Sequence, residues 1–109
     1  MSRDYRLYLD DILQAIEYIR EYVESMDSVR FASDRKTRDA VIRNLEIIGE
    51  ASRNLPDEIK ASAAEIDWRK IMALRNILVH EYFGVSVSIL WDIVQNKLDH
   101  LDAVCRQIL

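Results

Sequence analysis

Apolar residues recur along the chain at alternating intervals of four and three, the pattern of helices that bury one face. The pattern is clearest over residues 4–26 and again from residue 87 onward. Weaker versions mark residues 34–54 and 68–83, so the sequence predicts four long helices. The two clear stripes are Tyr5, Leu9, Ile12, Ile16, Ile19, Val23 and Met26, then Val87, Trp91, Val94, Leu98, Leu101, Cys105 and Ile108.

Residues suited to helix ends bound these segments. Ser33 or Asp34 can cap the second helix, which follows a connector at residues 25–33. Pro56 ends it, because the residue before a proline avoids helical geometry, and residues 57–64 can form a short helix. The remaining signals are Asp67 and either Ser86 or Ser88 as caps of the third and fourth long helices, and Gly84 as the end of the third.

The length and composition indicate one helical domain. The chain has 109 residues, enough for one core, and only two glycines and one proline, which are too few for the turns of a sheet protein. We therefore expect a single all-α domain over residues 1–109. Its architecture would be an up-and-down bundle of four long helices plus one short helix.

Charge and targeting signals narrow the function further. A net charge of −4 argues against a general nucleic-acid coat, although it leaves room for a local basic site. The single cysteine excludes an internal disulfide and fits a reducing compartment. No apolar run reaches the roughly 18 residues of a membrane span, and the charged N-terminus does not resemble a signal peptide. We expect a cytoplasmic protein that does not associate with membranes.

The densest cluster of chemically capable residues is at residues 75–83, where Arg75, Asn76, His80 and Tyr82 occur together. A guanidinium is permanently charged and forked for phosphate, and a histidine can transfer protons near neutral pH. Together they suit RNA cleavage by the RNA's own 2′-hydroxyl, which needs no metal or cofactor. The alternative is a structural histidine beside a surface arginine.

On an ideal helix, the side chains of Arg75 and His80 point in different directions. Five residues correspond to about 500° of helix, so Arg75 and His80 point about 140° apart. Either the helix loosens near His80, or two subunits bring their motifs together in composite sites, which predicts a homodimer. Asn76 and His80 share a face, so Asn76 could bond the imidazole or contact a phosphate.

Other notable residues have simpler structural interpretations. His100 fits an ordinary helix position, Cys105 a small core residue, and Trp68 and Trp91 core anchors. Gly49 lies in the middle of a predicted helix, where glycine usually marks a close approach of a neighbouring backbone. His80 has no second histidine or cysteine at ligand spacing, so the sequence shows no metal site.

The order and spacing of several stretches resemble the HepT-like proteins, a branch of the all-helical HEPN superfamily. The resemblance covers nearly the whole chain. The matching stretches are residues 34–37, residues 40–51, Asp67-Trp68-Arg69, residues 75–84 and Trp91-Asp92-Ile93.

The resemblance implies a dimeric, metal-independent ribonuclease that acts as the toxin of a type VII toxin–antitoxin pair. Arg75 and His80 would be the catalytic pair in a cleft between subunits, with Asn76 as a supporting polar group. The antitoxin would be a minimal nucleotidyltransferase, MntA-like, that transfers AMP to Tyr82. Glu50 also matches the family, and its role stays unassigned.

Two other functions are compatible with the same residues. One is a non-catalytic helical module that binds a minimal nucleotidyltransferase. The other is a purely structural helical dimer. Substitution of His80 separates them, because only the ribonuclease would lose RNA cleavage while its fold remained intact.

Overall fold

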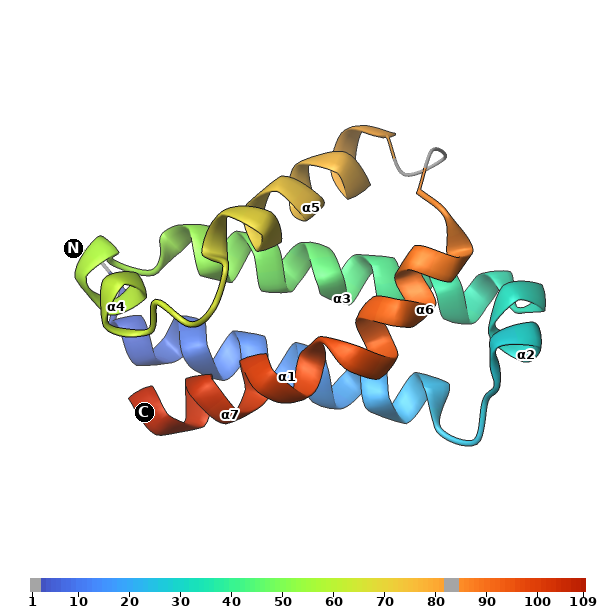
Figure 1. The fold of residues 1–109 in the computed structure, drawn as a ribbon, viewed down its shortest axis with the longest axis horizontal. Coiled ribbons are helices and arrows are strands. Elements are labelled where there is room, and N and C mark those ends of the chain that lie inside the picture. The colour runs from blue at the N-terminus through green and yellow to red at the C-terminus, as the bar shows by residue number, and fades with distance from the viewer. Residues whose placement is uncertain (1–2, 82–84) are drawn as a thin grey trace.

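The computed structural model describes residues 3–81 and 85–109, and these residues form helices and connecting turns without a strand (Figure 1). Three long helices are α1 (Tyr5–Val23), α3 (Arg35–Asn54) and α5 (Trp68–Glu81). Shorter helices are α2 (Ser28–Ser33), α4 (Asp57–Ser62), α6 (Val87–Asn96) and α7 (Leu98–Ile108). The predicted all-α class is confirmed.

Helix α3 is the centre of the arrangement. It packs along α1 on one side and α5 on the other, while α7 lies against α1 and α6 against α2. Figure 1 shows α1 and α3 side by side, with α5 crossing above them and both chain ends at the same end of the molecule. None of the described helices is both long and apolar enough to cross a membrane.

Two predicted segments differ from the structure. The connector expected at residues 25–33 contains α2, whose first turn is closed by Asp27, which accepts a hydrogen bond from the Arg30 backbone N–H at 2.8 Å. The single long helix expected from residue 87 onward is broken at Lys97, where φ is −112° and ψ is −20°. The break lets α6 pack against α2 while α7 packs against α1, which one straight helix could not do.

The apolar stripes form the core. In α1, Leu9, Ile12, Ile16 and Ile19 are fully buried, as the spacing predicts. Phe31 of α2, also fully buried, packs against the ring of Trp91 with centroids 5.0 Å apart.

Trp68 and Cys105 occupy the core as predicted. The Trp68 indole Nε1 donates to the Ala63 carbonyl oxygen at 3.1 Å, so its one polar group is satisfied. Burial raises the pKa of the Cys105 thiol to about 12. At neutral pH this thiol stays protonated and behaves as a small apolar side chain.

Gly49 permits close contact between α3 and α5. A Cβ atom at this position would overlap the Cβ of Arg75 and lie 3.4 Å from its Cα. The predicted close approach is thus confirmed, and its neighbour is the first residue of the candidate motif. A mid-helix glycine costs up to about 1 kcal/mol relative to alanine, so the packing has to offset that cost.

Candidate functional site

Helix α5 holds Arg75, Asn76 and His80 in one continuous helix. It begins after Asp67, whose side chain accepts a hydrogen bond from the Lys70 backbone N–H at 3.2 Å, and it continues through Glu81. Of the two alternatives, a helix that loosens near His80 does not agree with the structure, because α5 is continuous as far as Glu81. On this helix Arg75 and His80 point about 140° apart.

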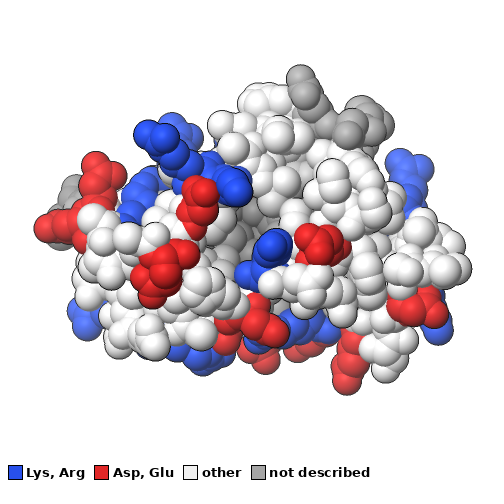
Figure 2. All heavy atoms as spheres, viewed as in Figure 1, with Lys and Arg blue, Asp and Glu red and all other residues white. Residues whose placement is uncertain are grey.

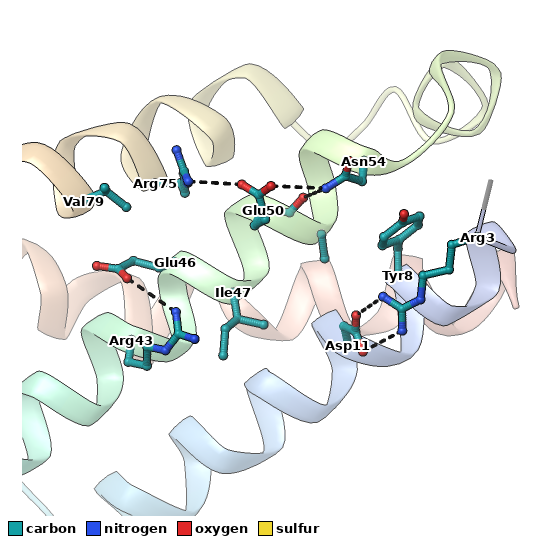
Figure 3. Close-up of a pocket in the computed structure, with 11 residues that line it drawn as sticks. Arg3, Tyr8, Asp11, Arg43, Glu46, Ile47, Glu50, Asn54, Arg75 and Val79 are labelled. Atoms are coloured by element: carbon teal, nitrogen blue, oxygen red, sulfur yellow. Dashed lines mark hydrogen bonds and ion pairs between the residues drawn. The ribbon is translucent and has the colours of Figure 1, made fainter. Parts of the chain in front are cut away.

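Arg75 is fixed against α3. Its side chain is only 25% exposed, and Nη2 lies 3.3 Å from Glu50 Oε2 (Figure 3). Its Nη1 donates to Asn76 Oδ1 at 3.2 Å. Glu50 Oε2 is closed off from solvent and accepts no hydrogen bond within the described structure, so its charge is balanced by the guanidinium of Arg75 at 3.3 Å and, farther away, by that of Arg53 at 4.0 Å.

Glu50 is held in turn by its own helix. Asn54 Nδ2 donates to the Glu50 backbone oxygen at 2.9 Å and lies 3.4 Å from Glu50 Oε1. Arg75, Glu50 and Asn54 therefore form a chain of polar contacts from α5 to the last turn of α3 (Figure 3). The sequence left Glu50 without a role, and the structure identifies it as the partner of the motif arginine.

Arg75 also lines a groove of about 470 Å³ across α1, α3 and α5. Figure 3 shows this groove, in which each arginine faces a carboxylate. The pairs are Arg3 with Asp11 at 2.7 Å, Arg43 with Glu46 at 3.8 Å and Arg75 with Glu50 at 3.3 Å. The guanidinium of Arg3 also lies over the Tyr8 ring, 4.8 Å from its centroid.

His80 and Asn76 are exposed on the outer face of α5. The partner that the structure gives Asn76 is Arg75, so the amide orients the guanidinium rather than the imidazole. Within one chain the structure does not bring Arg75 and His80 to one point. Tyr82 and Gly84 lie outside the described residues.

A family model described as "Ribonuclease HepT-like" matches residues 12–108, which include every helix of the bundle except the start of α1. The chain belongs to the HepT-like ribonuclease family. This agrees with the resemblance carried by residues 34–37, 40–51 and 75–84, among others.

Curated relatives support the same HepT-like assignment. The chain is 46% identical to a protein named "Probable ribonuclease HepT" from Thermococcus cleftensis over 101 residues, 93% of this chain and 92% of that protein. It is 42% identical to a "Putative RNase" of Methanocaldococcus jannaschii over 89% of this chain and 80% of that protein. A "Putative RNase" of Caldanaerobacter subterraneus is 38% identical over 95% of this chain and 93% of that protein. No solved structure matches the chain significantly.

Exposed apolar side chains occur on α5 and α6 of this HepT-like chain. Ile77, three residues before His80, is 46% exposed, Val79 is 40% exposed and Ile89 of α6 is 54% exposed. Figure 2 shows that the surface over the C-terminal half of α5 is mostly uncharged in this view. Exposed apolar side chains on the helix that also exposes His80 suit a surface that a second protein covers.

Potential metal ligands are scattered in the described part of the chain. No group of three or more histidine, cysteine, aspartate or glutamate residues there could hold a metal ion. His100, expected to be an ordinary helix residue, lines a second groove between α5 and α7. That groove is mainly apolar, and Lys70 and Lys97 also line it.

Proposed function

We propose that this protein is a metal-independent endoribonuclease whose active site combines Arg75 with the His80 of a second subunit. The observation that carries the proposal is the fixed, partly buried guanidinium of Arg75, aimed into a groove and flanked by an exposed histidine on the same helix. The family to which the chain belongs and the names of its relatives support the coarser part of the proposal, a ribonuclease.

The residues fit cleavage by an internal 2′-hydroxyl. His80 would take the proton from that hydroxyl or protonate the leaving 5′-oxygen, and Arg75 would stabilise the charge that develops on the phosphate. The 2′-oxygen bonds to phosphorus as the bond to the 5′-oxygen breaks. The products are a 2′,3′-cyclic phosphate and a 5′-hydroxyl. Asn76 would keep the guanidinium oriented.

A homodimer would resolve the geometry of the motif. Because Arg75 and His80 of one chain point about 140° apart on a continuous helix, a single phosphate cannot contact both. A two-fold axis beside the outer face of α5 would place each histidine near the arginine of the partner. The exposed Ile77, Val79 and Ile89 supply apolar surface for such an interface.

The biological role that we propose is the toxin of a type VII toxin–antitoxin pair. Its partner would be a minimal, MntA-like nucleotidyltransferase that transfers AMP to Tyr82. Tyr82 follows His80 by two residues in the sequence. An adenylyl group there would add bulk and negative charge beside a site for RNA phosphates, and would repel the substrate.

The test is RNA cleavage in EDTA by the wild type, His80→Ala and Arg75→Ala, with the product ends analysed. Intact mass is measured first, so that protein adenylylated on Tyr82 is not mistaken for inactive enzyme. We expect each substitution to lower the rate by about 10²-fold or more. The wild type should leave 2′,3′-cyclic phosphate ends.

Circular dichroism and thermal unfolding serve as controls for the fold of both variants. If unmodified wild type cuts no cellular RNA, or the variants cut equally well, the ribonuclease proposal fails. A binding partner of a nucleotidyltransferase would then be the better description, and His80→Ala should leave that binding intact.

A further inference from the structure

The groove beside Arg75 extends well beyond the motif. Arg43 and Glu50 are seven positions apart on α3, which is about 10 Å along the helix. Tyr8 and Arg3 form the wall contributed by the α1 end of the chain (Figure 3). At a rise of about 3.4 Å per stacked nucleotide, this distance corresponds to roughly three nucleotides.

The arginines in the groove differ in how firmly they are held. Arg75 is 25% exposed and fixed between Glu50 and Asn76, whereas the Arg43 side chain is 70% exposed and lies 3.8 Å from Glu46. Because the Arg43 guanidinium is exposed and lies near the outer limit of an ion pair with Glu46, that contact contributes little to stability, and Arg43 can leave its carboxylate at small cost. The groove thus combines a fixed cation at the motif with a movable cation about two turns away along α3.

We propose that this groove binds the RNA strand next to the scissile phosphate, with Arg43 holding a second phosphate of the same strand. The proposal rests on the proposed function for the identity of the ligand. Guanidinium groups bind phosphate through two parallel hydrogen bonds, which suits Arg43 and Arg75 as successive phosphate contacts. The guanidinium of Arg3, which covers the Tyr8 ring, is itself a planar group of the kind on which bases stack.

The carboxylates paired with the groove arginines determine how RNA would bind. In the free protein each arginine of the groove has an acidic partner, so the groove carries little net charge. A phosphate therefore has to replace Glu46 as the partner of Arg43. Substitutions of the two residues should therefore have opposite effects on RNA affinity. Loss of Arg43 should weaken RNA binding, and loss of the Glu46 charge should strengthen it.

The chain offers a matched control pair on the same helix. Arg35 and Asp39 are also 3.8 Å apart and exposed, but neither lines the groove. Arg35→Gln changes the net charge as much as Arg43→Gln does, and Asp39→Asn matches Glu46→Gln. Any effect of overall charge on RNA affinity would therefore appear equally in the control variants.

The experiment is fluorescence anisotropy with a labelled single-stranded RNA that carries 2′-O-methyl groups and cannot be cleaved internally. It is run in EDTA over a series of salt concentrations, with thermal unfolding as the check on each variant's fold. Arg43→Gln should raise the Kd about fivefold and reduce the salt slope by about 0.7. Glu46→Gln should lower the Kd about twofold, and Arg35→Gln and Asp39→Asn should each stay near the wild type.

Equal effects of the groove variants and the control variants would overturn the proposal, as would an unchanged Kd in Arg43→Gln or no binding by the wild type. Because the RNA cannot be cleaved, the result is separate from the catalytic test. A wild type that cleaves RNA while Arg43→Gln binds normally refutes only the groove. A protein that binds through Arg43 without cleaving refutes only the catalysis.

Discussion

The two ends of α5 are built differently. Its N-terminal part is capped by Asp67 and anchored by the buried Trp68, and the helix is pressed onto α3 as far as its middle, where Arg75 meets Gly49. Its C-terminal part carries His80 and Ile77, which are exposed to solvent. The fold of one chain therefore fixes the arginine but leaves the histidine without a surrounding site. The difference is what the proposed composite site, completed by a second subunit, requires.

Mixing two inactive subunits gives the largest expected effect. Arg75→Ala still carries His80, and His80→Ala still carries Arg75, so a mixed dimer has one intact composite site. In an equal mixture half the dimers are mixed, and we expect about a quarter of wild-type cleavage where each variant alone has about 1% or less. Cleavage is measured after subunit exchange, and an inactive mixture would contradict shared sites.

At the fixed end of α5, Gly49→Ala should be strongly destabilising. The added Cβ overlaps that of Arg75, so one helix has to move, at a cost of about 2 kcal/mol in unfolding free energy. Urea unfolding measures this cost. Arg75→Gly removes the opposing Cβ, so the double variant should lose about 1 kcal/mol less than the sum of the single variants. Arg75→Ala keeps that Cβ and is the control, for which we expect a smaller coupling.

The cap of α5 should have the smallest of these effects. Asp67→Ala removes the acceptor of the Lys70 N–H and should lower the unfolding free energy by about 1 kcal/mol. Ser86→Ala is the matched control, because Ser86 precedes α6 without forming a side-chain cap bond. Similar losses in both variants would show that the hydrogen bond of Asp67 does not stabilise the fixed end.

Much of the fold could be predicted because its signals are local. The apolar stripe of α1 and the cap at Asp34, which accepts from the Thr37 N–H at 3.0 Å, are both readable within a few residues. Helix α2 is too short to show a period. The break at Lys97 has no proline or glycine to mark it, and the apolar spacing continues across it. The break accompanies the contacts of α6 with α2 and of α7 with α1, which are tertiary information.

The site was only partly predictable for the same reason. The cluster of Arg75, Asn76 and His80 is visible in the sequence, and helix periodicity already separates the arginine from the histidine. The pairing of Arg75 with Glu50 spans 25 positions in the sequence and depends on the close contact at Gly49. No local pattern reports which carboxylate meets a given arginine. The glycine beside Glu50 was the one indirect signal.

The burial of Cys105 has a practical consequence. It is the only cysteine of the chain, and it stays protonated at neutral pH inside the core. Maleimide reagents attack thiolates at accessible positions, so they should leave the native protein unlabelled. A cysteine introduced at an exposed position can then carry a spin label or a fluorophore without prior removal of the natural one. Distances between two labelled subunits would become measurable in solution with a single substitution.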